Sequence, residues 1–170
     1  MITKIISGGQ TGADQGGLDF ALSYNIPHGG ECPLGRRCEN GKIPPRFKLT
    51  ESTSASYLPR TLTNVIDSDA TLICTLSATL TGGSLKTQQF CISHKKPFLH
   101  IHPKLDNIAT VVYDFMEFHN PSILNVAGSR ESKEIGIYGW TRAILELIGA
   151  HVSEIPFDVV SEEQPTIHTF

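Results

Sequence analysis

Three short segments of this 170-residue chain combine glycines with hydroxyl side chains. They are Ser7–Asp14 (SGGQTGAD), Leu80–Ser84 (LTGGS) and Ala127–Ser132 (AGSRES). Glycine lets backbone N–H groups approach a ligand closely, and serine or threonine adds a hydroxyl donor of little bulk. Arg130, in the third segment, carries a guanidinium that can bind phosphate or carboxylate through two parallel hydrogen bonds. Together these residue types favour a site for a phosphorylated or otherwise anionic small molecule.

The glycine segments do not match the best-known nucleotide-binding signatures. Gln10 and Thr11 stand where G-x-G-x-x-G requires glycine, and no Lys-Ser/Thr pair follows these glycines as in a P-loop. Lys86-Thr87 follows the second glycine pair, but it lacks the preceding glycine and the full loop length. ATP hydrolysis and a standard nicotinamide site are therefore disfavoured.

Asp14 is the residue of the first segment that is hardest to explain. A carboxylate repels a phosphate unless a cation or a sugar hydroxyl lies between them. Two interpretations remain open: Asp14 caps backbone donors at the start of a helix, or it contacts a hydroxyl of the ligand. Asp19, five residues further along the same helix, is predicted to be solvated.

Short apolar runs alternate with longer helical patterns along the chain. The patterns predict strands over 3–7, 70–76, 97–101 and 122–127, and helices over 14–25, 57–68, 83–94, 105–119 and 137–148. In the helix over 57–68, Leu58, Leu62, Val65 and Ile66 share the predicted apolar face. This alternation is typical of a doubly wound α/β fold, with a mostly parallel sheet and helices on both faces.

In such a sheet, ligands bind beyond the carboxyl ends of the strands, where strand gives way to helix. The three glycine segments follow predicted strands, so we expect them to line one shared pocket. The alternative is that each is a tight turn without a ligand. Arg60, in the second predicted helix, is either solvated or a second contact to the anion.

A single domain is expected over residues 1–156, followed by a C-terminal tail over 157–170. A long loop over about 29–56 interrupts the pattern, and its basic side chains outnumber its acidic ones. The basic residues are Arg36, Arg37, Lys42, Arg46 and Lys48. Long loops often serve as lids or binding loops, and a solvated excursion or an oligomer contact is the alternative. Arg37 is the candidate in this loop for a ligand contact.

The composition excludes several classes of partner. Fourteen basic and 17 acidic residues give a net charge of −3, which argues against a general affinity for nucleic acid or an anionic membrane. The sequence contains no apolar run long enough for a membrane span or a signal peptide, so we expect a cytoplasmic protein.

No metal site is predicted. Cys32 and Cys38 lack a matching second pair, and His100 and His102 lack a third ligand in the sequence. Cys74 and Cys91 lie in apolar surroundings and are expected in the core.

Several motifs in combination resemble the putative molybdenum carrier family, the circularly permuted YpsA-like branch of the SLOG superfamily. They are SGGQTGADQGGLDFA, GECPLGRR, RTLTNVIDSDATLI, GGSLKT and LNVAGSRES, and the resemblance extends over about residues 3–150. It implies a Rossmann-like domain, a homo-oligomer (dimer or tetramer), and a nucleotide or molybdenum cofactor, a phosphorylated pterin, as the carried ligand.

The resemblance also implies that the turns at 8–14, 82–87 and 128–131 form the pocket. With the arginines named above, the predicted ligand-binding residues are Ser7, Gly8, Gly9, Gln10, Thr11, Gly12, Asp14, Arg37, Arg60, Gly82, Gly83, Ser84, Thr87, Gly128, Ser129, Arg130 and Glu131.

Two functions remain open at this stage. Similar phosphoribohydrolases split a base from a nucleoside monophosphate and carry a Gly-Gly-x-Gly-Thr motif followed by a catalytic glutamate. Here Leu85 replaces the glycine of that motif, and Gln88 and Gln89 stand where the acid is sought. Without that acid, a binding or carrier protein is favoured. The alternative is a nucleotide hydrolase in which Asp14 or Glu131 acts as the general acid–base.

Overall fold

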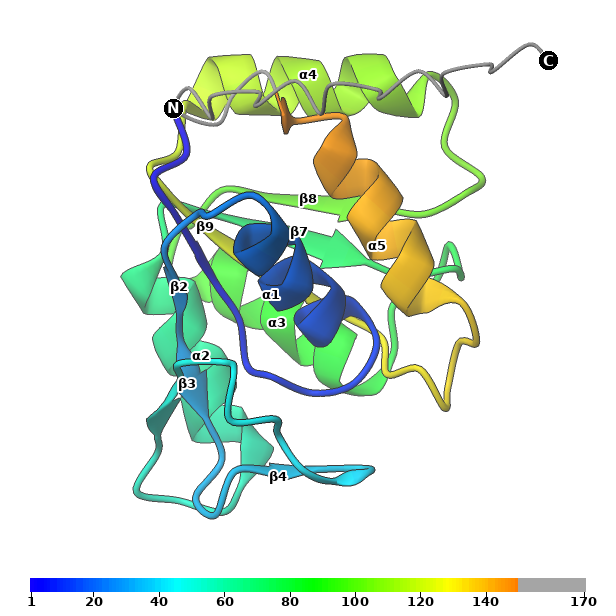
Figure 1. Cartoon of the computed structure of the whole chain (residues 1–170). Helices are drawn as coiled ribbons and strands as arrows, with labels where there is room; N and C mark the ends of the chain where they lie inside the picture. The colour runs from blue at the N-terminus through cyan, green and yellow to red at the C-terminus, as the bar shows by residue number, and fades with distance from the viewer. Residues whose placement is uncertain (150–170) are drawn as a thin grey trace, which may run out of the picture.

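The computed structural model describes residues 1–149, and its centre is a sheet of five parallel strands (Figure 1). In spatial order these are β2 (His28–Gly29), β1 (Lys4–Ile6), β9 (Ile123–Gly128), β7 (Ala70–Cys74) and β8 (Phe98–Ile101). The expected doubly wound, Rossmann-like α/β fold in a single domain is confirmed. The predicted domain end at residue 156 and the tail over 157–170 lie outside the described residues.

The central strands are apolar because both faces of the sheet are covered. All five residues of β7 are buried, as are Leu124 and Val126 of β9. The register pairs Cys74 with Gly128 and Ile6 with Asn125, so the carboxyl ends of β7, β9 and β1 lie at one edge of the sheet. After β1 the chain returns to the sheet as β2, on one side of the central strand β9. After β7 it returns as β8, on the other side of β9. Such a switch point is where open α/β sheets bind ligands.

Five helices cover the sheet. They are α1 (Ala13–Ser23), α2 (Tyr57–Asp67), α3 (Gly82–Ser93), α4 (Ile108–His119) and α5 (Ile137–Glu146). Helices α1 and α5 pack together on one face, and α2 and α3 pack together on the other (Figure 1). Phe20, Met116 and Ile144, from α1, α4 and α5, belong to one apolar core. Within residues 1–149, none of these helices is both long and apolar enough to cross a membrane.

Helix α2 departs from its predicted orientation. Leu58 and Ile66 were expected to face the core, yet they are 47% and 44% exposed. Val65 is buried as predicted, and the other buried residue of α2 is Asn64. Apolar periodicity therefore predicted only part of the inner face, because another part of that face lines a polar cavity rather than the core.

Residues 29–56, predicted as a long structureless loop, form a small folded unit that we call the loop subdomain. It contains a parallel pair, β3 (Glu31–Cys32) with β6 (Thr50–Glu51), and an antiparallel hairpin, β4 (Arg37–Cys38) with β5 (Gly41–Lys42). Its own apolar cluster consists of Leu18, Cys32, Cys38, Ile43 and Phe47. Short strands of two residues carry no recognisable alternation, so periodicity could not predict them.

Two basic side chains of the loop subdomain have structural contacts, one within the subdomain and one to α1. Arg36 donates to the carbonyls of Phe47 at 2.8 Å and Pro44 at 3.1 Å. Arg46 forms an ion pair with Asp19 at 3.0 Å, which corrects the prediction that Asp19 is simply solvated.

Candidate functional site

A cavity of about 400 Å³ lies at the switch point, between the N-terminal turns of α2 and α3 and the segments that follow β1 and β9. Eleven of the predicted ligand-binding residues line it. They are Gly8, Gln10, Asp14, Arg60, Gly82, Gly83, Ser84, Thr87, Gly128, Ser129 and Arg130. All three glycine segments therefore contribute to one cavity, as the strand-end argument anticipated.

Ser7, Gly9, Thr11 and Gly12 lie behind the cavity wall and shape the first turn. The Ser7 hydroxyl donates to the Val126 carbonyl at 2.6 Å, which fixes the end of β1 against β9. Gly9 and Gly12 have φ angles of +80° and +79°, which side chains other than glycine rarely adopt. The Thr11 hydroxyl donates to the carboxylate of Glu39.

Glu131 and Arg37 are also outside the cavity lining. The Glu131 carboxylate accepts the backbone N–H groups of Gly136 at 2.6 Å and Tyr138 at 3.0 Å. This places it at the start of α5, where a carboxylate satisfies helix donors that lack partners. Arg37 is exposed on β4.

Positive charge collects at the N-terminus of α3. Its N-cap, Thr81, makes no capping hydrogen bond with its side chain, and the Thr81 hydroxyl accepts from Lys133 Nζ at 2.5 Å. Lys86, Arg130 and Lys133 line the cavity beside this helix end. The ion pairs within residues 1–149 are Arg46–Asp19 and Arg60–Asp14, so these three cations have no carboxylate partner there.

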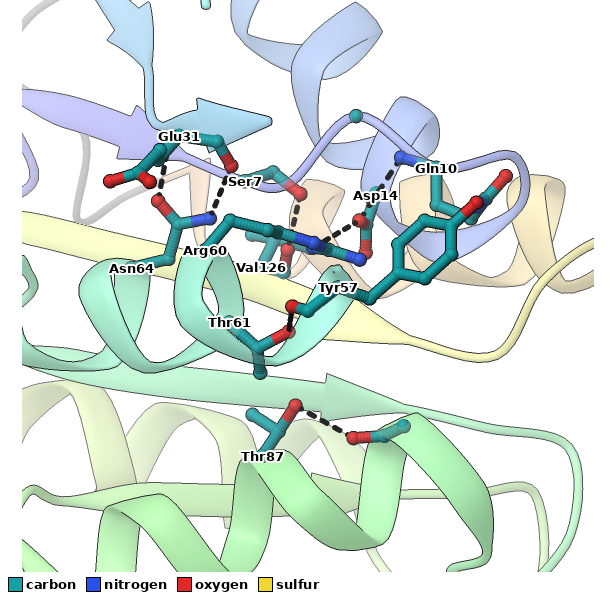
Figure 2. A network of polar contacts seen from close by, with 12 residues as sticks. Ser7, Gln10, Asp14, Glu31, Tyr57, Arg60, Thr61, Asn64, Thr87 and Val126 are labelled. Carbon is teal, nitrogen blue, oxygen red and sulfur yellow. Dashed lines mark hydrogen bonds and ion pairs between the residues drawn. The ribbon is translucent and has the colours of Figure 1, made fainter. Parts of the chain in front are cut away.

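On the opposite wall, Arg60 and Asp14 form a buried ion pair. Arg60 Nη1 lies 3.4 Å from Asp14 Oδ2, and the two side chains are 13% and 6% exposed. Figure 2 shows the Arg60 guanidinium directed toward this carboxylate. The solvated alternative for Arg60 is therefore wrong. Gly8 makes room for the pair, since a Cβ there would lie 1.5 Å from Arg60 Nη1.

Asp14 also accepts the backbone N–H of Gln10 at 3.1 Å, so it does cap a donor of the first turn (Figure 2). Burial raises the pKa of the Asp14 carboxyl, and the neighbouring Arg60 guanidinium acts in the opposite direction. A buried carboxyl with a perturbed pKa in a cavity is typical of functional sites.

Helix α2 supplies cavity residues that sequence analysis missed. Tyr57, Thr61 and Asn64 line the cavity together with Arg60. The Tyr57 ring centroid lies 5.6 Å from the guanidinium carbon of Arg60 and 5.1 Å from that of Arg130. These positions follow the i, i+3, i+4, i+7 spacing of one helix face. This stripe of polar residues along one face of α2 is the sequence pattern that would have predicted a cavity-lining helix.

Asn64 joins α2 to the loop subdomain. Its Oδ1 accepts the Glu31 N–H at 2.7 Å, and its Nδ2 donates to the Glu31 carbonyl at 3.0 Å (Figure 2). Both atoms of the amide are occupied, so Asn64 acts as a structural link at the cavity wall.

Glu39, at the tip of the β4–β5 hairpin, holds two cavity segments together. Its carboxylate accepts the Thr11 hydroxyl of the first turn, and the backbone N–H of Ser132 at 3.2 Å. The Ser132 hydroxyl donates to the same carboxylate. Burial acts to raise the pKa of Glu39, but the hydrogen bonds from Ser132 and Thr11 outweigh it and lower the pKa.

We expect Glu39→Gln to loosen the hairpin, because the amide nitrogen cannot accept the hydrogen bonds made to the carboxylate oxygen that it replaces, and the remaining oxygen is uncharged. Amide hydrogen exchange at residues 37–42 should accelerate about tenfold, as for the loss of a hydrogen bond to a charged group. Exchange in the core strand β7 should be unchanged. Unaltered protection of the hairpin would show that Glu39 does not hold it.

The candidate metal ligands do not assemble. Within the described part of the chain there is no group of three or more His, Cys, Asp and Glu side chains that could hold a metal ion. Cys32, Cys38, Cys74 and Cys91 are free and buried. The His100 and His102 rings lie 5.0 Å apart, and His100 Nε2 is 2.6 Å from the Thr75 hydroxyl.

The fold and the cavity together define a Rossmann-like protein with an electropositive cavity at its switch point. Residues 5–148 match the model of the circularly permuted YpsA SLOG family, and the chain belongs to that family. No curated protein sequence matches it at a significant level.

A crystal structure from Syntrophus aciditrophicus, described as a "Putative molybdenum carrier protein", is similar over 86% of this chain and 94% of its own. The two share 44% sequence identity, with a TM-score of 0.82. The family resemblance read from the motifs is thereby confirmed.

Proposed function

We propose that this protein is a binding or carrier protein for a phosphorylated nucleotide-like or pterin small molecule. The observation that carries the proposal is the gathering of Arg130, Lys133 and Lys86, without carboxylate partners among the described residues, beside the uncapped end of α3. Backbone N–H groups at a helix N-terminus favour an anion, and adjacent cations strengthen that preference.

In this proposal, different residues bind the phosphate and the organic part of the ligand. The backbone N–H groups of Gly82, Gly83 and Ser84 donate hydrogen bonds to the phosphate oxygens. They are free to do so because none of them has a backbone acceptor in the described chain. Arg130, which is exposed beside Tyr57, supplies a guanidinium fork to the same group. The organic part of the ligand lies deeper, against Tyr57 and the wall that carries Asp14.

The relative from Syntrophus aciditrophicus supports a carrier role by its description as a "Putative molybdenum carrier protein". Molybdenum cofactor is a phosphorylated pterin, so it combines a phosphate for the α3 end with a ring system for the deeper part of the cavity. The volume of about 400 Å³ lies within the range of ordinary ligand pockets.

We expect Arg130→Ala to weaken binding of a phosphorylated ligand by about 1.5–3 kcal/mol, as for the loss of a hydrogen bond to a charged group. Calorimetry with a panel of nucleoside monophosphates and a phosphorylated pterin measures this. Arg142→Ala, which removes the same charge outside the cavity, is the control and should leave affinity unchanged. Equal affinities of wild type and Arg130→Ala would show that Arg130 does not bind the ligand.

A second candidate function is hydrolysis of the N-glycosidic bond of a nucleoside monophosphate. It is favoured by the buried Asp14 carboxyl in the cavity, whose raised pKa suits a general acid–base. Release of free base from a panel of nucleoside monophosphates is the test. Hydrolysis requires turnover by the wild type and its loss in Asp14→Asn, with Glu131→Gln as the parallel variant. Absence of turnover leaves binding as the function.

We infer a cytoplasmic homo-oligomer, a dimer or tetramer, from the family resemblance. Native mass spectrometry of the purified protein reports the subunit number and any bound small molecule together. A monomeric mass would contradict this inference.

A further inference from the structure

The cavity wall formed by the first turn presents an oriented amide. Gln10 is 5% exposed, and its Oε1 accepts the backbone N–H groups of Thr11 at 3.2 Å and Glu39 at 2.9 Å. Only the carbonyl oxygen of an amide can accept these bonds, so its orientation is determined. Nε2 is consequently left as a donor, and it is buried without an acceptor among the described residues.

A buried donor without a partner is unfavourable, and native proteins rarely leave one without a reason. Gln10 lines the cavity, so a ligand there would supply the missing acceptor once the side chain moves to expose Nε2. The Nε atom of Arg60, on the same wall, is a second buried donor without a partner in residues 1–149.

Asp14, beside Gln10, supplies the complementary acceptor. Its Oδ2 already accepts from Gln10 N and Arg60 Nη1. Its Oδ1 makes no hydrogen bond within the described chain, so one carboxylate oxygen is available at the cavity. Within the described chain, the first-turn wall therefore carries a side-chain donor without a partner, on Gln10, and a carboxylate oxygen without a hydrogen bond, on Asp14 four residues later.

We propose that Gln10 and Asp14 recognise a lactam edge, in which a ring carbonyl stands beside a ring N–H. The carbonyl oxygen accepts from Gln10 Nε2, and the ring N–H donates to Asp14. The 6-oxopurines and the pterins share this edge, whereas adenine presents a donor and an acceptor in the reverse order. This inference rests on the proposed function, since it assigns the organic part of the phosphorylated ligand.

Calorimetry compares inosine monophosphate with adenosine monophosphate, with inorganic phosphate as the probe of the α3 end alone. The two nucleotides differ at the purine edge and share the sugar and the phosphate. We expect the wild type to bind inosine monophosphate at least about tenfold more tightly, because both hydrogen bonds are reversed in the adenine nucleotide. A phosphorylated pterin is titrated in parallel. Whichever of inosine monophosphate and the pterin binds more tightly identifies the class of ligand, 6-oxopurine or pterin, that the site prefers.

Gln10→Glu inverts the recognition with almost no change in shape. One carboxylate oxygen still accepts from Thr11 and Glu39, and the other replaces the Nε2 donor with an acceptor. The preference for inosine monophosphate should therefore fall at least about tenfold. Gln89→Glu, an exposed residue of α3 outside the cavity, adds the same charge and should leave the preference unchanged. If Gln10→Glu fails to fold, Gln10→Met removes the donor at similar volume and must lower the preference likewise.

Equal binding of the two nucleotides by the wild type, or an unchanged preference in the Gln10 variants, would overturn the lactam assignment. Those results would leave the proposed function intact, provided that inorganic phosphate still competes with either nucleotide. Failure of every phosphorylated probe and of inorganic phosphate to bind would instead reject the proposed function, and the lactam assignment with it.

Discussion

Gly128→Ala is expected to lower the free energy of unfolding by roughly 3 kcal/mol or more, the range for severe overpacking. An added Cβ would lie 1.9 Å from the Cys74 carbonyl oxygen and 2.7 Å from the Ala13 Cβ. Neither neighbour is a flexible side chain that can move aside. The third glycine segment is therefore held against β7 and the start of α1 by the absence of a side chain at Gly128.

The displacement would also disturb the turns that form the cavity. Ser129 N donates to the Cys74 carbonyl at 3.1 Å, and Ala13 N donates to the Ser129 carbonyl at 3.1 Å. Both bonds join the residue after Gly128 to the neighbouring segments. We expect ligand affinity to fall together with stability.

Urea unfolding followed by circular dichroism measures the effect, with Gly139→Ala as the matched control. A Cβ at Gly139, within α5, meets no atom within 4 Å. Alanine is the better helix former, so this control should stabilise the protein by about 0.5–1 kcal/mol. A Gly128→Ala protein as stable as the wild type would show that the sheet edge tolerates the added methyl group.

Arg60→Ala is expected to destabilise the fold by about 3 kcal/mol at neutral pH, because it leaves the Asp14 carboxylate buried without its cation. The pair is largely enclosed, with side-chain exposures of 13% and 6%. Gln10 N would remain as the one hydrogen-bond donor to Asp14 among the described residues. Thermal unfolding of wild type and variant compares the two stabilities.

The pH dependence of this effect follows from the pKa of Asp14. Burial raises that pKa above its ordinary value of 3.8, so the folded protein binds the proton more tightly than the unfolded chain does. The contribution of Asp14 to the free energy of unfolding therefore falls as the pH rises from the ordinary pKa of 3.8 through the raised pKa of the folded state. Without Arg60 the pKa rises further. The loss caused by Arg60→Ala should thus be smallest near pH 4 and largest at neutral pH.

The double variant Arg60→Ala with Asp14→Asn is the control for this explanation. Because asparagine carries no charge to bury, the double variant should be more stable than Arg60→Ala alone at neutral pH. A double variant as unstable as the single one would assign the effect to the packing of the arginine side chain rather than to the buried, unpaired charge of Asp14.

The sequence predicted the doubly wound fold, every strand of the central sheet except β2, and the place of the cavity. Apolar runs such as 70–76 report burial on both faces of the sheet directly, and strand order then brings the three glycine segments to one edge. Gly82, Gly128 and Arg130 were found in this way. Their role depends on residue type and on position after a strand, and both can be inferred from the local sequence.

The missed features depend on contacts between residues far apart in the chain. Glu39 meets Ser132 across 93 residues, and no local pattern connects them. The loop subdomain likewise gains its core from Leu18 of α1. In α2 the misleading signal was local, because Leu58 and Ile66 were predicted to be buried, whereas Ile66 is exposed and Leu58 lines the cavity with Tyr57 and Arg60.

The central claim is that a phosphate group binds at the N-terminus of α3, and amide chemical shifts test it most directly. Inorganic phosphate, the group that all the proposed ligands share, is titrated into isotope-labelled protein while two-dimensional spectra are recorded. Phosphate bound at this helix end should shift the Gly82, Gly83 and Ser84 amides saturably, and Arg130→Ala should reduce these shifts. Shifts confined to residues outside the cavity, or none at all, would contradict the claim.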